Sequence, residues 1–363
     1  MTPYFDRDGV TIYNGDCRSV LPLLAEASVN CVVTSPPYWA LRDYGVEGQV
    51  GLEADPGQFV RVMVAIFQEV KRVLRPDGTL WLNLGDTYAN VGKWGGKSGG
   101  KSGFRHTAET NGAGAFRRRR GTDIDPKRGE ENGEGAIYKS LKGKDIVGIP
   151  WRVAFALQDA GWVLRQDIVW SKPNAMPESV KDRCTKAHEY IFLLSRGPRY
   201  FYDNEAIKEP ASPDTHARYA RGRSTDHKWA DGGPGNQTIA KSFEHMRPGV
   251  NPKAAENVPG SRQNASFSEA VKDIVDDRNK RSVWTVPTYP YPGAHFATFP
   301  PDLIKPCVLA GCPEGGTVLD PFLGSGTTAQ VAQDLGRRCV GIELNPKYCK
   351  LAVKRFRQRL LAV

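Results

Sequence analysis

Residues 316–343 constrain the fold most strongly, because they read as strand, glycine loop, helix and second strand. An apolar run precedes Gly324 and Gly326, and a backbone without Cβ atoms can approach a ligand closely at such positions. The second strand, Arg338–Ile342, ends in Glu343, which lies 17 residues after Gly326. This is near the offset expected of an acid that binds ribose hydroxyls. The segment therefore predicts an α/β fold with a nucleoside site.

The glycine loop also narrows the choice of nucleoside. It lacks the third glycine of the dinucleotide-binding fingerprint and offers no pyrophosphate cradle, so it favours S-adenosylmethionine over NAD as cofactor. An alternative for Glu343 is a solvated carboxylate at a strand end, directly before a helix that begins at Asn345 and Pro346.

The rest of the chain alternates strands with helices. Apolar residues recur at steps of three and four between Phe59 and Leu74, as on one face of a helix, which a turn at 75–78 would end. This alternation predicts a doubly wound, mostly parallel sheet. The other expected elements are strands at Val10–Tyr13, Val29–Val33, Thr79–Leu84, Val163–Trp170 and Glu189–Leu194, and a helix at Pro150–Ala160.

A polar tetrapeptide, Ser35, Pro36, Pro37 and Tyr38, follows the strand that ends at Val33. Open α/β sheets bind ligands at the carboxyl ends of their strands. Because proline has no N–H and a fixed φ, the Pro36 carbonyl should point outward as a free acceptor. Ser35 adds a second acceptor and Tyr38 a stacking face, which suits a planar base that carries an amino group. Taken alone, the same tetrapeptide is usually only a turn.

Together these motifs resemble the DNA amino-methyltransferases of the permuted β group. In that family the Ser-Pro-Pro-Tyr motif lies near the amino end and the cofactor loop near the carboxyl end, as in this chain. The resemblance implies a circularly permuted, Rossmann-like methyltransferase fold that uses S-adenosylmethionine and acts on double-stranded DNA. Further matching segments occur in the same order, namely Asn14–Cys17, Leu82–Asp86, Trp170–Asn174, His188–Tyr190 and Ala294–Pro300.

The chemistry of an exocyclic amine explains the catalytic motif. Its lone pair is delocalised into the ring, so hydrogen bonds to Ser35 Oγ and the Pro36 carbonyl would have to aim it at the methyl group. The base must leave the duplex, and Tyr38 would stack on it. Trp39 either lines this pocket or packs in the hydrophobic core. The resemblance favours cytosine N4 as target, with adenine N6 as the alternative and an inactive DNA-binding regulator as a different class.

The resemblance also implies the cofactor contacts. Asp16 would bind the adenine amino group, although it equally suits a helix N-cap. Asp320 would lie near the methionine end, which the segment containing Phe299 would pack against. Asp86, Lys172 and His188 could line the cleft without an assigned role. The full predicted cofactor set is Asp16, Phe299, Asp320, Phe322, Gly324, Gly326, Thr327 and Glu343, and no metal site is expected.

Two segments do not fit the alternating pattern. Residues 88–145 hold 13 Gly and 13 Lys or Arg against 7 Asp or Glu, which predicts a mobile basic insert over DNA, or else a solvated linker. Residues 203–285 are polar and occupy the place of the family's target recognition region. The catalytic and cofactor-binding domain would then comprise residues 1–87, 146–202 and 286–363.

Composition agrees with a nucleic-acid enzyme without proving one. The chain has 363 residues, a net charge of +10 and seven cysteines without a Cys-x-x-Cys pair. No apolar signal or membrane-spanning run is visible, so we expect a cytoplasmic protein from a prokaryotic cell or a phage. A cognate restriction endonuclease is a possible partner, and the sequence leaves monomer and dimer open.

Overall fold

The computed structural model describes residues 1–89, 141–211, 277–288 and 299–360. The chain divides into two compact units, Met1–Ala206 with Arg281–Val363, and Ile207–Lys280. Most of the predicted basic insert and of the predicted recognition region lies outside the described residues. The larger unit contains all of the secondary structure discussed below, except one pair of short strands.

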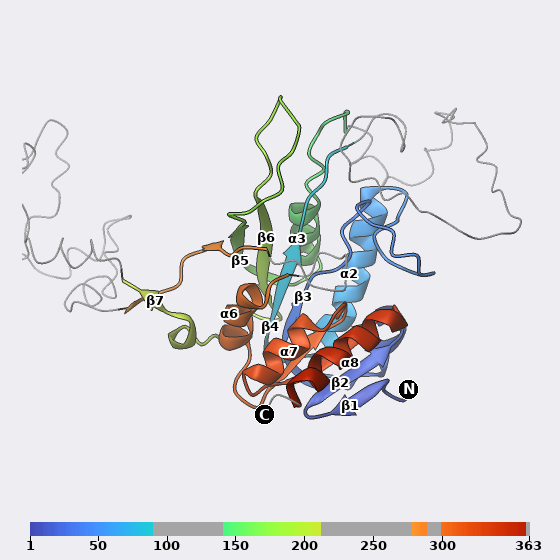
Figure 1. Cartoon of the computed structure of the whole chain (residues 1–363), viewed down its shortest axis with the longest axis vertical. Helices are drawn as coiled ribbons and strands as arrows, with labels where there is room; N and C mark the ends of the chain where they lie inside the picture. The colour runs from blue at the N-terminus through green and yellow to red at the C-terminus, as the bar shows by residue number, and fades with distance from the viewer. Residues whose placement is uncertain (90–140, 212–276, 289–298, 361–363) are drawn as a thin grey trace, which may run out of the picture. The chain divides into compact units, whose positions relative to one another are not determined.

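In its described residues, the larger unit is built on one nine-stranded sheet with the order β1-β2-β11-β10-β3-β4-β6-β5-β9 (Figure 1). Only β1 and β6 run antiparallel to their neighbours. The predicted mostly parallel, doubly wound fold is therefore confirmed. The strands are β1 Phe5–Arg7, β2 Val10–Asn14, β3 Val29–Thr34, β4 Leu74–Leu84, β5 Val163–Ser171, β6 His188–Ser195, β9 Val283–Thr285, β10 Thr317–Asp320 and β11 Arg338–Glu343.

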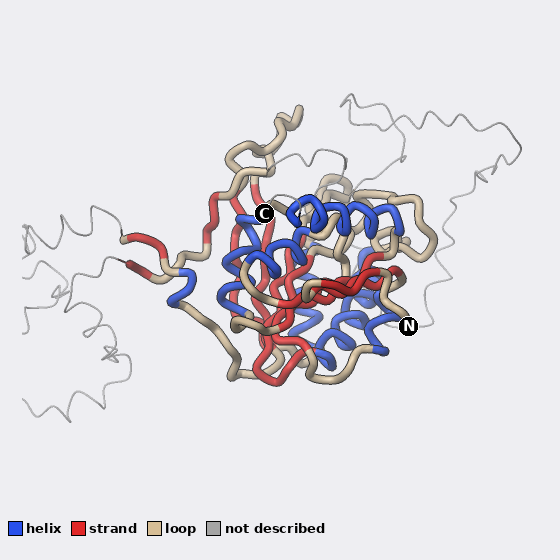
Figure 2. Tube along the Cα trace, turned by 60° about the horizontal axis from the view of Figure 1, so that its bottom comes forward, coloured by secondary structure: helices blue, strands red, loops and turns tan. Residues whose placement is uncertain are grey.

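Helices cover both faces of this sheet (Figures 1 and 2). On one face α2 packs against α3, and on the other α7 packs against α6 and α8. Central strands are therefore buried on both sides, which explains why residues 31–34 of β3 are all buried. The helices are α1 Cys17–Val20, α2 Pro56–Val73, α3 Ile149–Asp159, α6 Pro301–Gly311, α7 Thr327–Asp334 and α8 Pro346–Leu360.

The helix ends follow local chemistry. Asp55 caps α2 by accepting a hydrogen bond from the Gln58 backbone N–H at 2.9 Å, and Pro56 occupies the first turn. Gly161 follows α3 with a φ of 88°, in the left-handed region that favours glycine. Residues 75–78, predicted as a turn, lie within the bounds of β4 but interrupt its pairing with β3, because Leu74 pairs with Val29 and the register resumes with Thr79 opposite Cys31.

The smaller unit is described only at its two ends. There β7, Glu209–Pro210, pairs antiparallel with β8, Asp277–Arg278. Arg278 Nε lies 3.0 Å from Glu209 Oε1. Across the described parts of both units, no helix combines the length and the apolarity that crossing a membrane requires.

Candidate active site

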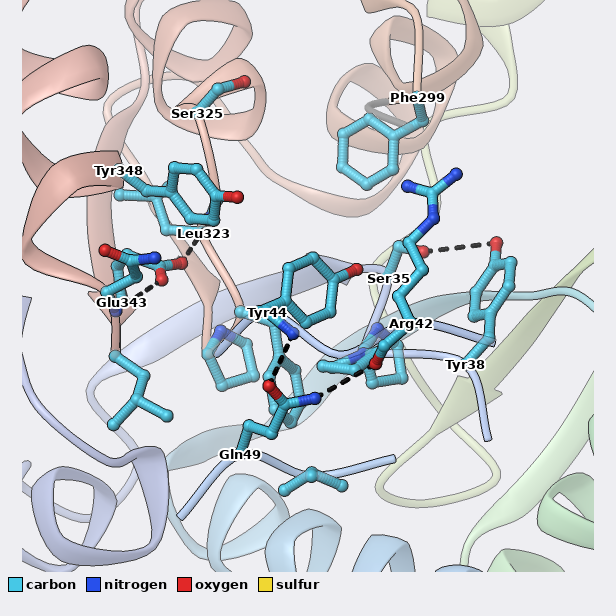
Figure 3. A pocket seen from close by; sticks show the side chains of 18 of the residues that line it. Ser35, Tyr38, Arg42, Tyr44, Gln49, Phe299, Leu323, Ser325, Glu343 and Tyr348 are labelled. Atoms are coloured by element: carbon cyan, nitrogen blue, oxygen red, sulfur yellow. Dashed lines mark hydrogen bonds between the residues drawn. The ribbon is translucent and has the colours of Figure 1, made fainter. Parts of the chain in front are cut away.

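A pocket of about 960 Å³ opens at the carboxyl edge of the sheet (Figure 3). Its walls come from the residues that follow β2, β3, β10 and β11, from the loop after Tyr38, and from parts of β4, β5 and β6. This is the edge at which open α/β sheets bind ligands. The strand order thus brings the two predicted motifs, nearly 280 residues apart in sequence, into one cavity.

All four residues of the Ser-Pro-Pro-Tyr motif line this pocket. They follow β3 directly, and among the described residues none donates a hydrogen bond to the Pro36 carbonyl. Gly51 holds the next loop against the motif. A Cβ atom at this glycine, whose φ is 101°, would lie 3.2 Å from Pro37 Cβ and from the Tyr38 carbonyl oxygen.

The Tyr38 side chain is held at both its ring and its hydroxyl. A Cβ atom at Gly85 would lie only 2.4 Å from the ring, so only glycine fits beside it. The hydroxyl donates to Glu189 Oε2 at 2.7 Å and lies 3.1 Å from Asn83 Oδ1. Burial, reinforced by the Glu189 charge, raises the pKa of Tyr38 well above its usual value, so the phenol stays protonated.

The glycine loop forms the opposite side of the pocket. Gly324 and Gly326 have φ values of 55° and 83°, and α7 begins directly after the second of them. Gly324 and Thr327 line the cavity together with Phe322, whereas Gly326 does not. The left-handed turn therefore brings a helix start and the bare backbone of Gly324 to the pocket.

Glu343 lies at the end of β11 and lines the same side of the pocket. Its carboxylate accepts hydrogen bonds from the backbone N–H groups of Gly324 and Asn345, each at 2.7 Å. Burial raises the pKa of this carboxyl to about 7. The side chain therefore fastens the glycine loop to the start of α8, and it is not the solvated carboxylate of the alternative interpretation.

Asp320 lies behind the pocket wall rather than on it, with 1% of its surface exposed. Its carboxylate accepts hydrogen bonds from Thr34 Oγ1 and Thr328 Oγ1, both at 2.6 Å, and from the Phe322 backbone N–H at 3.0 Å. Burial raises its pKa to about 6. This position favours an indirect role, in which Asp320 joins the ends of β3 and β10 and orients Phe322.

Two more predicted cofactor residues, Asp16 and Phe299, line the pocket. Asp16 also caps α1 through the Arg18 backbone N–H at 2.8 Å and pairs with the Arg18 guanidinium, which confirms the N-cap expected of it. Ser325 Oγ is buried beside the glycine loop without a hydrogen-bond partner in the described part of the chain. A polar ligand in the pocket would satisfy it, so the residues present fit a cofactor with polar ends.

The loop after the catalytic motif forms a wall that the sequence patterns did not indicate. Gln49 holds it in shape by accepting from the Tyr44 backbone N–H at 2.7 Å and donating to the Arg42 carbonyl at 3.0 Å. In Figure 3, Tyr44 stands between the Glu343 side and the Ser35 side of the pocket. Trp39, by contrast, packs against the core and does not line the cavity.

Other residues near the pocket divide into structural and lining groups. The Asp86 carboxylate accepts from the backbone N–H groups at the start of α3 and is structural. His188 does not line the pocket, although its neighbour Glu189 does. Four polar residues without a predicted role line the pocket from β4, β6 and the residues after β5, namely Asn83, Lys172, Asn174 and Glu189. All four belong to sequence segments that match the family, and this match is the signal that could have identified them as pocket residues.

Comparison with known proteins assigns this arrangement to a family. A family described as DNA methylase (N6_N4_Mtase) matches residues 29–354. The chain belongs to this DNA methylase family. Its match begins at β3 and runs into α8, so it includes both sides of the pocket.

Relatives match over nearly the whole chain. Type II methyltransferase M.XycI of Xanthomonas campestris pv. cyanopsidis is 44% identical over 348 residues, which cover 96% of this chain and 88% of the relative. Type II methyltransferase M.Cfr9I of Citrobacter freundii is 42% identical over 349 residues, with the same two coverages. These likenesses support an amino-methyltransferase of DNA.

Solved structures share the fold at lower identity. PvuII DNA methyltransferase (cytosine-N4-specific) has a TM-score of 0.57 at 16% identity and covers 98% of this chain and 88% of its own. TTHA0409 from Thermus thermophilus was solved with S-adenosyl-L-methionine and has a TM-score of 0.50 at 22% identity. The match covers 96% of this chain and 93% of TTHA0409. The fold is that of S-adenosylmethionine-dependent DNA methyltransferases.

Proposed function

We propose that the chain transfers a methyl group from S-adenosylmethionine to the N4 amine of cytosine in double-stranded DNA. The observation that carries this proposal is that Ser35 and the Pro36 carbonyl share one pocket with the Gly324 loop and Glu343. Two acceptors for an amine and a nucleoside site therefore face the same cavity. The names of its type II relatives support a role in restriction and modification, with a cognate endonuclease as partner.

The protein acts mainly by orienting the amine. Ser35 Oγ and the Pro36 carbonyl accept its two hydrogens and turn the nitrogen lone pair out of conjugation, toward the methyl donor. Tyr38, whose ring is fixed against Gly85, packs against a base that has left the duplex. No covalent enzyme intermediate is required, and the surplus proton leaves the methylated nitrogen after the transfer, because a serine hydroxyl is a weak base at neutral pH. The circular permutation of the fold is part of the same proposal, because the target motif precedes the cofactor loop.

The cofactor would occupy the side of the pocket formed by the glycine loop. S-adenosylmethionine supplies an electrophilic methyl group when bound. Glu343 would accept hydrogen bonds from ribose hydroxyls, and Asp16 would bind the adenine amino group. Ser325 Oγ, which has no hydrogen-bond partner among the described residues, would serve a polar end of the cofactor. Phe299 and Phe322 would cover its apolar parts.

The product decides the base assignment. DNA methylated by the purified protein, digested to nucleosides and analysed by mass spectrometry, is expected to contain N4-methylcytosine. N6-methyladenine would keep the enzyme class but refute the target base. 5-Methylcytosine would overturn the mechanism, because that reaction needs a cysteine nucleophile and residues 34–39 contain none. No methyl transfer to any DNA would support the inactive regulator.

Cofactor affinity should depend on pH through Glu343. In the free protein its pKa is about 7, raised by burial, so the carboxyl is largely protonated below that pH. Ribose hydroxyls donate best to the ionised form, and binding therefore lowers this pKa and releases a proton. The affinity should fall by up to tenfold per pH unit below about pH 7 and stay level above it. Calorimetry between about pH 6 and pH 8, in buffers of different ionisation enthalpy, measures both effects.

A further inference from the structure

Three polar side chains surround the Tyr38 hydroxyl. Its oxygen lies 2.7 Å from Glu189 Oε2, 3.1 Å from Asn83 Oδ1 and 3.4 Å from Ser35 Oγ (Figure 3 shows the last contact). Glu189 in turn forms an ion pair with Lys172. These side chains come from β4, β6, the residue after β5 and the turn after β3, so the sheet itself fixes their relative positions.

The contacts determine which way each hydrogen points. The Asn83 amide N–H groups donate to the Tyr190 carbonyl at 3.1 Å and to Glu189 Oε2 at 3.3 Å, and this orientation turns the amide oxygen toward Tyr38. Two acceptors, this amide oxygen and the Glu189 carboxylate, therefore compete for the single phenol hydrogen. The Tyr38 oxygen is left as an acceptor for Ser35, whose own hydrogen is directed away from the ligand space.

We propose that Glu189 and Asn83 are positioning residues that fix the direction of the Ser35–Tyr38 hydrogen bond and so keep the Ser35 lone pairs facing the target amine. The proposal rests on the proposed amine methylation. A serine hydroxyl that rotates freely can donate its hydrogen to the amine nitrogen instead. That hydrogen bond would occupy the lone pair that attacks the methyl group.

The first test replaces the phenol hydroxyl while keeping the ring. Tyr38→Phe should lower kcat about tenfold, the effect of one orienting hydrogen bond, and leave the KM values for DNA and cofactor unchanged. Tyr200→Phe is the matched control, because that hydroxyl accepts a hydrogen bond from Arg165 at 3.0 Å outside the pocket. Full activity of Tyr38→Phe would overturn the proposal.

A double-mutant cycle separates positioning from general support of the fold. If the Tyr38 hydroxyl acts through Ser35, Tyr38→Phe should have almost no further effect on kcat in a Ser35→Ala background. A merely structural role would lower kcat by the same factor in both backgrounds. Additive effects would therefore contradict the proposal even if each single variant is impaired.

The third test changes the acceptor itself. Glu189→Gln should lower kcat, because Lys172 retains the glutamine oxygen and turns its NH₂ group, a donor, toward Tyr38. The loss should be smaller than in Tyr38→Phe, since Asn83 Oδ1 still accepts the phenol hydrogen. Adding Lys172→Met frees the glutamine to turn its oxygen to Tyr38, so the double variant should be more active than Glu189→Gln alone. A double variant without such recovery would show that charge matters rather than hydrogen-bond direction, and would overturn the proposal.

These outcomes are distinguishable from failure of the proposed function. If the unmodified protein yields N6-methyladenine, the same hydrogen-bond direction is still required and the variants keep their expected order. If it transfers no methyl group to DNA, the proposed function fails and the premise of the positioning role fails with it. If it methylates DNA and all variants match it, only the positioning role is refuted.

Discussion

Ser35→Ala is expected to lower kcat for DNA methylation about a hundredfold while cofactor affinity stays unchanged. The substitution removes one of two acceptors that aim the amine, and losing a preorganised polar group at a reacting centre costs on the order of 10² to 10³ in rate. Ser35 lies in the pocket next to the Pro36 carbonyl, whereas Glu343 lies on the other side of Tyr44 (Figure 3). Single-turnover kinetics with labelled cofactor measure the chemical step, and calorimetry measures cofactor binding.

The matched control is Ser28→Ala, an exposed serine whose hydroxyl bonds to the Ala25 carbonyl at 2.7 Å, away from the pocket. It should behave like the unmodified protein. A Ser35→Ala variant with full activity on duplex DNA would place the catalytic centre elsewhere, and the interpretation of residues 34–39 would then be wrong.

The parts of this site that sequence reasoning could predict are those set by one strand and its following turn. β3 and the Ser-Pro-Pro-Tyr motif are contiguous, and so are β10 and the Gly324 loop. Parallel strands end at the same edge of a sheet, so recognising β3 and β10 as parallel strands was enough to expect that these motifs would meet. The position of Glu343 at the pocket follows from the same rule, because β11 lies beside β10 and runs parallel to it.

Glu189 could not be placed by that rule. β6 is antiparallel to β4 and β5, so its first residues lie at the edge where its neighbours end. An apolar pattern does not reveal strand direction, and the glutamate at the start of β6 gave no sign that it faces Tyr38. The loop carrying Arg42 and Tyr44 was missed for another reason, since its shape depends on Gln49 rather than on any repeating pattern.

Asp320 shows where a motif alone misleads about mechanism. At the end of a cofactor strand an acid is expected to contact the ligand, and the sequence indicated that position for it. Thr34 and Thr328 instead enclose the carboxylate with their hydroxyls, and it is 1% exposed. Only the packing of β3 beside β10 brings Thr34 within reach, and no local sequence feature reports that pairing.

Glu343→Ala is expected to weaken cofactor binding at least tenfold. It removes the acceptor for the ribose hydroxyls, at about 1.5 to 3 kcal/mol for a charge-assisted hydrogen bond, and it also releases the Gly324 and Asn345 N–H groups that the carboxylate now holds. The glycine loop then loses the anchor that shapes its side of the pocket. Calorimetry with S-adenosylmethionine measures the affinity, and DNA binding without cofactor should be unchanged.

Two comparisons make this prediction specific to the carboxylate. Glu343→Gln keeps the size of the side chain but sets an NH₂ group against one of the two backbone donors, so its affinity should also fall and should lose the pH dependence below about pH 7. Glu314→Ala removes an exposed carboxylate outside the pocket and should bind like the unmodified protein. Thermal unfolding shows whether Glu343→Ala is folded. If it is folded and its cofactor affinity is unchanged, Glu343 is only an anchor for the loop, and the ribose contact must be assigned to another residue.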